Sequence, residues 1–441
     1  MTPSNLAAVV LAAGIGTRMH SAKPKHLHEL LGRRLVDWVV EAARQLGPDP
    51  LVVVTSPESR GAFDGVDVAV QAEPRGTGDA LAAAREQLSA FAGDLLVLAG
   101  DVPLLRAELL EALVETHRRE SAAATVLSFR PADPRHYGRV IRDGDGSVSA
   151  IVEAGDATPE QLELGEVNSS IYVFASEQVW PALGRLDAEN VQGELYLTDA
   201  VRHLVAEGER VAAHVASDPL EAEGVNTRAE LAAVAAALRD RLNEAHMLAG
   251  VTIVDPRTTW IDADVELEPD ATVHPFTVLS GRTRVGGGAV VGPHVVAVDA
   301  SIGPGATVGP FCYLRPGTEL EAGAKAGTFV EIKNSRIGEG TKVPHLSYIG
   351  DADVGEGTNI GAGAITANYR PELGPGKLRT TIGRNVHTGS DNVFVAPVTI
   401  GDNAWVAAGS VVTKNVPPGA LAIARSRQVN KEGYDDRKQH D

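Results

Sequence analysis

Aliphatic residues recur at every sixth position through much of the second half of the chain. The series are Ile261, Leu267, Val273, Leu279, Val285 and Val291; then, in shifted phase, Ile302, Val308, Leu314 and Leu320; then Ile337, Val343 and Ile349; and last Phe394, Ile400, Val406 and Val412. A helix repeats its apolar face about every 3.6 residues and a half-buried strand every second residue, so neither explains this spacing. Together with the glycines and prolines between the repeats, the pattern predicts a parallel β-helix of hexapeptide repeats.

Each hexad of such a fold supplies one short strand and one tight turn, and three hexads close one triangular coil. The aliphatic residue points into the coil, and stacked coils share one apolar core. The periodicity by itself leaves function open, because a β-helix can serve as a structural spacer as well as an enzyme.

The first half of the chain follows another rhythm. Short aliphatic strands are expected at residues 7–12, 51–55, 95–99 and 125–129, with Ala-rich or Leu-rich helical segments between them. This alternation is typical of a Rossmann-like α/β domain, with a parallel sheet and helices on both faces. Such sheets bind ligands beyond the carboxyl ends of their strands, so residues 14–18 and 100–101 are candidate binding loops.

A chain of 441 residues is too long for one ordinary core. Between the two halves, Leu231, Val234, Leu238 and Leu242 keep helical spacing after the capping residues Asn226 and Thr227, and Gly250 ends the run. We therefore predict an α/β domain at 1–225, a helical linker at 226–250, and a β-helix with a C-terminal tail at 251–441.

Charge and cysteine content narrow the classes of partner. With 58 acidic and 40 basic residues the net charge is -18, which argues against nucleic acid as a partner. The single cysteine, Cys312, cannot form an internal disulfide, and no apolar run is long enough for a membrane span. We expect a cytoplasmic protein without a membrane partner, in which an anionic substrate must meet a local basic pocket.

The loop after the first expected strand, residues 11–19, places two glycines where backbone amides could surround a phosphate. It is not a dinucleotide fingerprint, because Met19 stands where the third glycine belongs, and no P-loop Gly-Lys-Ser/Thr is present. Taken alone, the loop is a weak signal.

The same loop resembles that of the nucleotidyltransferases that join a sugar 1-phosphate to a nucleoside triphosphate. Further matches follow in the family's order: Pro24-Lys25, residues 71–77, residues 98–103, Tyr137-Gly138, residues 151–153, Asn168 and residues 223–226. Seven ordered matches are more specific than one loop. A lone Asp after a strand is more often a turn former than a metal ligand. Because Asp101 lies within the ordered family matches, we interpret it as a metal ligand.

The resemblance implies roles for individual residues. Asp101 and Asn226 would hold Mg²⁺, and Arg18 and Lys25 would cover the triphosphate and act in catalysis. The implied UDP-sugar site comprises Leu11, Ala12, Ala13, Gly14, Lys25, Gln71, Gly76, Thr77, Gly138, Glu153, Asn168 and Asn226. Ala99 departs from the family, where a Tyr often precedes the Gly-Asp pair, and its effect on sugar choice stays open.

The hexad repeat is interrupted at residues 344–351 and 368–377, and insertions in a solenoid usually lie on its working face. The residues there, with residues 315–317, 329–333, 359–362, 389–391 and 422–425, resemble the trimeric hexapeptide-repeat acyltransferases. More narrowly, they resemble the acetyltransferase half of the bifunctional glucosamine-1-phosphate N-acetyltransferase and N-acetylglucosamine-1-phosphate uridylyltransferase family. The two resemblances together cover nearly the whole chain.

This resemblance implies a left-handed β-helix, a homotrimer with acetyl sites between adjacent coils, and acetyl-CoA and UTP as co-substrates. His345 is the expected catalytic base, and Glu331 would orient its ring or stabilise its protonated form. The implied glucosamine-phosphate site comprises Arg315, Lys333, Tyr348, Asn359 and Lys377, and the acetyl-CoA site Ala362, Asn368, Tyr369, Ser390, Ala408 and Arg425. The loop at residues 370–376, which precedes Lys377, is longer than usual in the family.

The sequence therefore predicts a bifunctional enzyme that acetylates glucosamine 1-phosphate and then couples the product to UTP with release of pyrophosphate. One alternative is a single-activity pyrophosphorylase whose β-helix only trimerises or regulates. Another is an inert sensor of nucleotide sugars. The back-half residues argue against the first, and Asp101, Lys25 and Asn226 argue against the second.

Overall fold

The computed structural model describes residues 5–14, 16–134 and 136–434. Backbone contacts divide the chain into two compact units within helix α7 (Arg228–Leu248), after Leu238. The helix covers most of the predicted linker 226–250, and the domain boundaries at 225 and 250 stay predictions. Among the described residues, no helix has the length and apolar character needed to cross a membrane.

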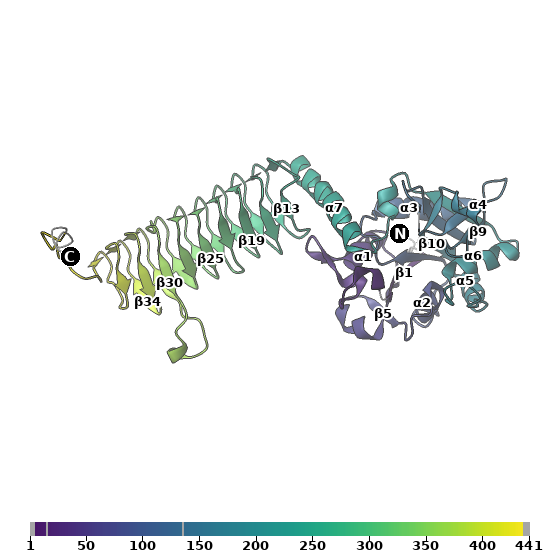
Figure 1. The fold of residues 1–441 in the computed structure, drawn as a ribbon, viewed down its shortest axis with the longest axis horizontal. Helices are drawn as coiled ribbons and strands as arrows, with labels where there is room; N and C mark the ends of the chain where they lie inside the picture. The colour runs from purple at the N-terminus through teal and green to yellow at the C-terminus, as the bar shows by residue number, and fades with distance from the viewer. Residues whose placement is uncertain (1–4, 15, 135, 435–441) are drawn as a thin grey trace, which may run out of the picture. The chain divides into compact units, whose positions relative to one another are not determined.

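The first unit is built on a mixed sheet with the strand order β11-β7-β10-β6-β1-β4-β5 (Figure 1). Its strands are β1 (Leu6–Ala12), β4 (Leu51–Thr55), β5 (Asp67–Val70), β6 (Asp94–Ala99), β7 (Ala124–Phe129), β10 (Val167–Ala175) and β11 (Val211–Val215). Neighbours run parallel except at β10, which is antiparallel to β6 and β7. The four strands expected from sequence are confirmed, each within one residue.

Two hairpins complete this unit. The first joins β8 (Arg139–Arg142) to β9 (Val148–Val152) and attaches to β10, and the second joins β2 (Glu29–Leu30) to β3 (Arg33–Arg34). The helices are α1 (Leu35–Gln45), α2 (Thr77–Ala83), α3 (Ala107–Glu120), α4 (Pro159–Leu162), α5 (Ser176–Leu183) and α6 (Leu197–Ala206). Short 3₁₀ turns are η1 (Thr17–Met19), η2 (Lys25–Leu27), η3 (Pro57–Ala62) and η4 (Pro219–Ala222).

Helices cover both faces of the sheet, which explains why its central strands β1, β4 and β6 are largely apolar. In β1, Ala7 and Val9 join the core under α2, α5 and α6, whereas Ala8 and Val10 join the core under α1 and α3. Successive side chains of a strand point to opposite faces, so a strand buried on both sides needs apolar residues at every position.

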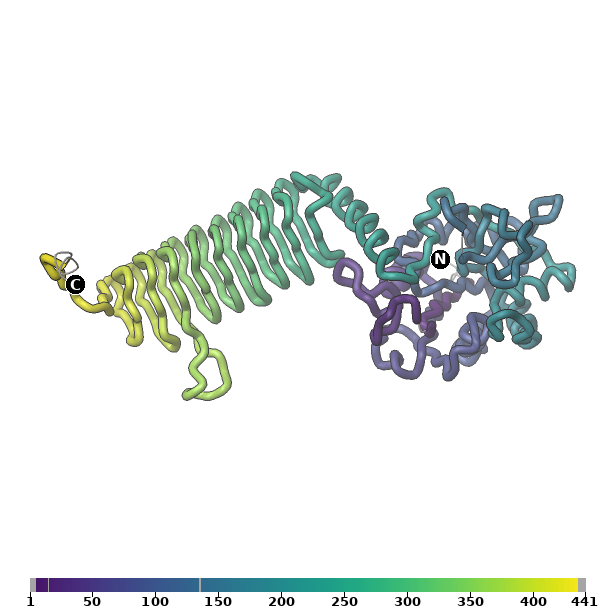
Figure 2. The backbone as a smooth tube through the Cα atoms, in the orientation of Figure 1, coloured from purple at the N-terminus to yellow at the C-terminus, as the bar shows by residue number. Residues whose placement is uncertain are grey.

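The second unit is a parallel β-helix of stacked coils with three faces (Figure 2). The first face contains β12 (Thr252–Ile253), β15 (Thr272–Val273), β18 (Val290–Val291), β21 (Thr307–Val308), β24 (Lys325–Thr328) and β27 (Lys342–His345). Through single bridges of Asn359 to Lys342 and His387 it continues into β32 (His387–Thr388), β35 (Trp405–Val406) and β37 (Leu421–Ala422).

The other two faces are equally regular. The second face contains β13 (Trp260–Ile261), β16 (Val278–Ser280), β19 (Val295–Val298), β22 (Cys312–Leu314), β25 (Glu331–Lys333), β28 (Tyr348–Gly350), β30 (Ile365–Ala367), β33 (Val393–Val395) and β36 (Val411–Val412). The third face contains β14 (Glu266–Leu267), β17 (Arg284–Val285), β20 (Ser301–Ile302), β23 (Glu319–Leu320), β26 (Arg336–Ile337), β29 (Ala352–Val354), β31 (Thr380–Ile382) and β34 (Val398–Ile400).

The core of the β-helix consists of the residues that the six-residue period predicts. Apart from the half-buried Leu267, every aliphatic residue of the four series, and Phe394 with them, is at most 3% exposed. Each coil places its inward residues directly on those of the next coil, as in the pairing of Leu314 with Ile332 and of Ile332 with Ile349. The β-helix predicted from periodicity is confirmed.

Helix α7 is fixed at both ends by side chains. Thr227 Oγ1 accepts a hydrogen bond from Glu230 N (3.2 Å), and the Glu230 carboxylate accepts from Asn226 N and Thr227 N, which is a capping box. Near the other end, the fully buried Asn243 donates to Pro256 O (2.9 Å) and Thr259 O (3.0 Å). The C-terminal half of α7, which belongs to the predicted linker, therefore packs against the first coil of the β-helix.

Candidate functional sites

Four polar side chains of the first unit meet at the carboxyl end of its central strands. The Lys25 ammonium contacts Asp101 Oδ2 and lies 3.0 Å from Asn226 Oδ1, and Arg18 Nη2 donates to the same Asn226 oxygen at 3.0 Å. Asp101 follows β6, and Asn226 precedes the N-cap of α7. The sequence prediction that these residues form one site agrees with this geometry.

The sheet itself brings this cluster together. Strands β1 and β6 are parallel neighbours, so the loops after them lie at one edge, and Gly100 N donates to Leu11 O at 2.9 Å. Gly16 has a φ of +67°, and a Cβ there would lie 2.5 Å from Lys25 Cβ. A side chain at position 16 would push Lys25 away from Asp101.

The cluster fits a hard divalent cation with few protein ligands. Asp101 and Asn226 each direct an oxygen at one positive group, the Lys25 ammonium, and such oxygens are the ligands that Mg²⁺ takes. The described residues contain no group of three His, Cys, Asp or Glu side chains placed for a metal. An ion at this point would therefore complete its shell with phosphate and water.

Beside the cluster lies a cavity of about 180 Å³. It is lined by Leu11, Thr77, Glu153, Ser170, Tyr172, Gln192, Glu194, Tyr196, Leu197 and Thr198. Three of the residues predicted for the sugar nucleotide, Leu11, Thr77 and Glu153, line it. Burial raises the pKa of Glu153 above its ordinary value, and Thr198 Oγ1 donates to its carboxylate at 3.3 Å.

Gly138 and Asn168 are joined to this cavity by hydrogen bonds. Asn168 N donates to Gly138 O (2.9 Å), and Asn168 Nδ2 donates to the hydroxyl of Tyr172 (2.8 Å), which lines the cavity. Gly138 also lies against Glu153, because a Cβ at Gly138 would be 3.3 Å from Glu153 Oε2. The predicted sugar residues therefore form one neighbourhood.

The predicted uracil-reading residues are tied to each other and to the start of α6. Gln71 is buried, and its Nε2 donates to Gly76 O (3.1 Å) and Asp79 Oδ2 (2.9 Å), while Thr77 Oγ1 accepts from Leu197 N (3.0 Å). Ala12 at the end of β1 and the following Ala13 are buried, and Gly14 is exposed.

Sequence reasoning missed part of the cavity wall. Gln192, Glu194 and Tyr196 come from the segment before α6, which carries no periodicity. Burial raises the pKa of Tyr196 to about 12. The one available signal is Asn190, whose side chain donates to Glu194 O (2.6 Å) and accepts from Glu194 N (3.1 Å), as turn-forming Asn residues do.

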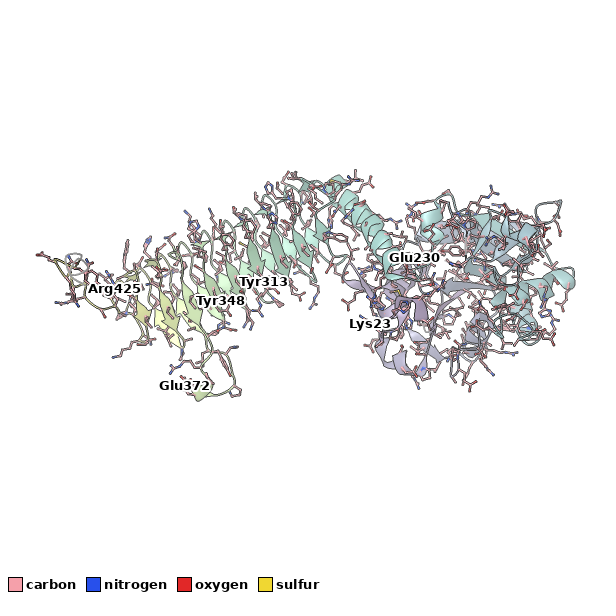
Figure 3. All side chains as sticks on the ribbon, in the orientation of Figure 1. Lys23, Glu230, Tyr313, Tyr348, Glu372 and Arg425 are labelled. Carbon is pink, nitrogen blue, oxygen red and sulfur yellow. The ribbon has the colours of Figure 1, made fainter. Side chains whose placement is uncertain are left out.

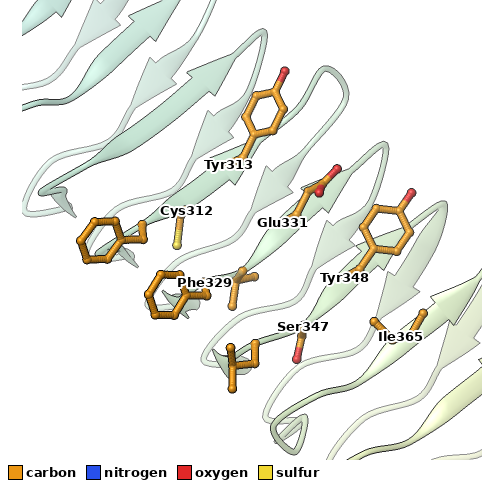
Figure 4. Close-up of a pocket in the computed structure, with 10 residues that line it drawn as sticks. Cys312, Tyr313, Phe329, Glu331, Ser347, Tyr348 and Ile365 are labelled. Carbon is orange, nitrogen blue, oxygen red and sulfur yellow. The ribbon is translucent and has the colours of Figure 1, made fainter.

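On the β-helix, an open groove of about 480 Å³ runs along one corner and the second face (Figure 4). It is lined by Phe311, Cys312, Tyr313, Phe329, Val330, Glu331, Leu346, Ser347, Tyr348 and Ile365. The outward residues Tyr313, Glu331, Tyr348 and Ile365 form a single column, because each pairs in register with the next. Glu331 and Tyr348 are predicted site residues.

Two predicted cations lie at the edge of this column. Arg315 Nη1 donates to Glu331 Oε1 at 2.9 Å, and Lys333 pairs in register with Gly350. A Cβ at Gly350 would overlap the ring of Tyr348, so the glycine allows that ring to lie flat over the strand. Arg315, Lys333 and Tyr348 are thus neighbours on the second face.

His345 lies apart from this group. It ends β27 on the first face, it is exposed, and its side chain has no hydrogen bond or ion pair within the described chain. Glu331 is bonded to Arg315 instead. Within the described residues, no hydrogen bond or ion pair therefore joins the predicted base to its carboxylate.

The interrupted repeat after Asn368 forms a projecting loop, which carries Glu372 at its far end (Figure 3). Its turn is the 3₁₀ segment η5 (Pro371–Leu373). At its base Tyr369 and Lys377 form a bridge, and Lys377 Nζ lies 4.1 Å from the centre of the Tyr369 ring. Lys377 is exposed and distant in sequence from the other predicted sugar-phosphate ligands.

The remaining predicted residues follow one another along successive coils. Ala362 O accepts from Asp391 N (2.7 Å), Ser390 O accepts from Gly409 N (2.8 Å), and a Cβ at Gly409 would lie 3.7 Å from Arg425 Cδ. Ala408 immediately precedes Gly409. Asn359 is exposed on the first face, away from the strands of Arg315 and Lys333.

Fold and geometry together define a class of protein: a nucleotidyltransferase domain joined to a hexapeptide-repeat β-helix that carries an open groove. Residues 8–205 match the family model of the MobA-like NTP transferase domain.

Similarity to curated proteins extends over nearly the whole chain. The chain is 50% identical to the bifunctional protein GlmU of Streptomyces coelicolor, over 98% of the chain and 94% of that protein. It is 49% identical to GlmU of Streptomyces avermitilis, over 98% of the chain and 94% of the relative, and 48% identical to GlmU of Mycobacterium tuberculosis, over 99% and 93%. The chain belongs to the GlmU family of bifunctional proteins.

Proposed function

We propose that the protein makes UDP-N-acetylglucosamine in two steps at two sites. The second unit acetylates glucosamine 1-phosphate with acetyl-CoA, and the first unit couples the N-acetylated product to UTP and releases pyrophosphate. The observation that carries the proposal is the joining of Arg18, Lys25, Asp101 and Asn226 in one cluster beside a cavity of sugar size.

In uridylyl transfer, a phosphate oxygen of the sugar attacks the α-phosphorus of UTP, and the bond to the leaving pyrophosphate breaks. Lys25 and Arg18 neutralise the charge that spreads over the phosphate oxygens, and Glu153 and Asn168 hold the sugar in line. Mg²⁺ held by Asp101 and Asn226 would supply further neutralisation of the triphosphate. Gln71 and Thr77 bind the base.

In acetyl transfer, the amine of the sugar attacks the thioester carbonyl of acetyl-CoA. His345 takes the amine proton and passes it to the departing CoA thiolate, and the C–S bond breaks as the C–N bond forms. Arg315, Lys333, Tyr348, Asn359 and Lys377 hold the sugar phosphate. Asn368, Tyr369, Ser390, Ala362, Ala408 and Arg425 hold acetyl-CoA.

The acetyl site is completed in a homotrimer. One chain leaves His345 without a side-chain partner and its groove open on one side, which is the expected state of half a site. A second copy of the chain fits this face because of the adjacent corner, where Phe276, His294, Phe311 and Phe329 stack at 4.8, 4.8 and 5.1 Å and Leu346 follows. We call these five residues the corner ladder.

The corner ladder is energetically unfavourable on a surface exposed to water, both in its backbone conformation and in its exposed apolar area. Its residues have φ between +51° and +58°, a conformation that bulky L residues rarely adopt, and its phenylalanines are about half exposed. The third face shows the opposite chemistry, with ion pairs such as Arg336–Glu321 (2.6 Å) and Arg379–Asp353 (2.9 Å). An apolar, strained ladder beside an open groove is best explained by burial against another subunit.

One assay tests both halves of the proposal. The protein is supplied with glucosamine 1-phosphate, acetyl-CoA, UTP and Mg²⁺, and free CoA and pyrophosphate are followed separately. We expect CoA to appear first and pyrophosphate to depend on the acetylated product. Pyrophosphate release from supplied N-acetylglucosamine 1-phosphate, without any CoA release from glucosamine 1-phosphate, would reduce the β-helix to a structural module.

A further inference from the structure

Asp351 is a buried carboxylate beside the acetyl site, and no function described above uses it. The residue is 4% exposed and follows β28 at a corner of the β-helix. Its Oδ1 accepts a hydrogen bond from Asn334 Nδ2 at 2.6 Å, and its Oδ2 accepts one from Asn368 Nδ2 at 2.5 Å. A buried carboxylate needs such donors, and here both donors are neutral amides.

The chemistry of the carboxylate fixes the direction of the Asn368 amide. An ionised carboxylate can only accept hydrogen bonds, so Asn368 must present its nitrogen to Asp351 and its carbonyl oxygen elsewhere. The same nitrogen also donates to the hydroxyl oxygen of Tyr348, at an N–O distance of 3.3 Å. No described residue donates to Asn368 Oδ1, which is therefore an acceptor without a partner.

The other end of this connection reaches the groove. Tyr348 lines the groove (Figure 4). Its ring lies over Gly350, where a Cβ would overlap the ring. Gly350 N in turn donates to Thr366 Oγ1 at 2.7 Å. Asp351 thus determines how one amide is presented at the edge of the acetyl site.

We propose that Asp351 is a positioning residue that holds the Asn368 carbonyl oxygen as an acceptor for an amide N–H of acetyl-CoA. The pantetheine arm of acetyl-CoA carries two secondary amides with N–H groups, whereas its phosphates can only accept hydrogen bonds. The inference rests on the proposed acetyl transfer and adds to it the direction of one hydrogen bond.

The test is the Asp351→Gly variant of the full-length protein. Glycine freely adopts the φ of +50° found at this position. The variant removes the acceptor that fixes the Asn368 amide, so Asn368 is free to turn and present its NH₂ group to the ligand. We expect the KM for acetyl-CoA and the Kd for CoA, measured by calorimetry, to rise about tenfold. The KM for glucosamine 1-phosphate and the rate of uridylyl transfer should stay within about twofold of wild type.

Two further variants separate positioning from a merely structural role. The first is the double variant Asp351→Asn with Asn368→Asp, which exchanges the amide and the carboxylate between the two positions. The new amide at position 351 donates to the new carboxylate at position 368, whose second oxygen again faces the ligand, so the KM for acetyl-CoA should return to within about threefold of wild type. The second, Asn334→Gly, removes the other hydrogen bond to Asp351 at an exposed corner with a φ of +45° that glycine adopts freely. This matched control should leave the CoA affinity unchanged.

An unchanged Kd for CoA in Asp351→Gly would overturn the proposal. A rise confined to the KM for glucosamine 1-phosphate would also overturn it, because the acceptor would then serve the sugar amine. If the single variant does not fold, the double variant decides alone, since positioning requires a near wild-type KM from it. A wild-type protein that releases no CoA would instead contradict the proposed function.

Discussion

The two sites differ in how their groups are brought together. In the first unit, loops after β1 and β6 and the start of α7 converge, and Arg18, Lys25, Asp101 and Asn226 contact one another within one chain. On the β-helix, Tyr313, Glu331 and Tyr348 stand in a column, one coil apart, and His345 lies on another face.

The difference follows from the geometry of the two folds. A parallel α/β sheet collects several loops at one edge, so it can surround a small ligand. A solenoid displays its side chains on flat faces, where each residue has neighbours only above, below and beside it. Such a surface becomes a closed site when a second surface covers it, which is why the front site is expected to act alone and the back site in an assembly.

Asp101→Ala tests whether the two sites work independently. Loss of the carboxylate leaves Lys25 with the neutral Asn226 in place of an anionic partner and removes a proposed metal ligand, so uridylyl transfer should fall by about 10³-fold or more. Acetyl transfer, followed as free CoA on the same sample, should stay within about twofold. A parallel fall in both activities, in protein with an unchanged melting midpoint, would contradict two independent sites.

His345→Ala is the reciprocal change. Without a base to take the amine proton, acetyl transfer should fall by about 10²- to 10⁴-fold. Pyrophosphate release from N-acetylglucosamine 1-phosphate and UTP provides the internal control and should not change. Acetyl transfer at the wild-type rate would remove His345 from the mechanism.

Phe329→Asp tests whether the back site needs a second copy of the chain. Asp occupies comparable corners at Asp299 and Asp351 with φ of +46° and +50°, so the coil should keep its stability. A charge in an apolar interface should weaken association and lower acetyl transfer about tenfold or more on dilution. Sedimentation and activity are measured over the same concentration series.

The matched control for that change is Glu319→Asp on the ion-paired third face, which should alter neither the sedimentation coefficient nor the activity. A stable wild-type monomer with full acetyltransferase activity would show that the groove of one chain is sufficient.

The smallest expected effect concerns Glu153. Burial raises its pKa, so the folded chain binds this proton more tightly than the unfolded chain. Its contribution to stability is therefore present below the unfolded pKa and is lost as the pH rises through the folded pKa. Glu153→Gln should raise the melting midpoint at pH 8 by about 1–3 °C and change it little near pH 4, while uridylyl transfer falls. The exposed Glu163→Gln serves as control.

The core of the β-helix was predictable because one inward residue per hexad must be apolar. The series from Ile261 to Val412 needed no tertiary information, and the same holds for β1, β4, β6 and β7, whose two buried faces require continuous apolar runs. The cluster of Asp101 with Lys25 followed from the rule that parallel strands present their carboxyl ends at one edge.

Contacts between coils were predictable only in part. Arg315 and Glu331 are 16 residues apart, and Asp351 and Asn368 are 17 apart, which is close to one coil of three hexads. Once the β-helix is recognised, this spacing predicts that the residues of each pair lie one above the other on adjacent coils. It could not have shown that Glu331 bonds to Arg315 rather than lying beside His345, because the face of each residue depends on the local register.

The cavity wall at residues 192–196 had no signal of that kind. Its residues meet Glu153 and Thr77 through the packing of α6 against β9 and α2. Such tertiary packing produces no periodic pattern in the local sequence. The sequence also did not show that α7 covers the first coil as well as linking the two units. Asn243 meets Thr259 O only after the first coil has formed.

Lys25, placed between Asp101 and Asn226, gives the first unit its own counter-ion. A triphosphate that attracts this ammonium exchanges one anionic partner for another, and the oxygens it leaves then attract a divalent cation. Nucleotide and cation should therefore bind with positive coupling, each raising the affinity for the other by the same factor. Because Lys25 is already paired before the nucleotide binds, added salt should weaken nucleotide binding less steeply than expected for a site with two free cationic side chains, Arg18 and Lys25.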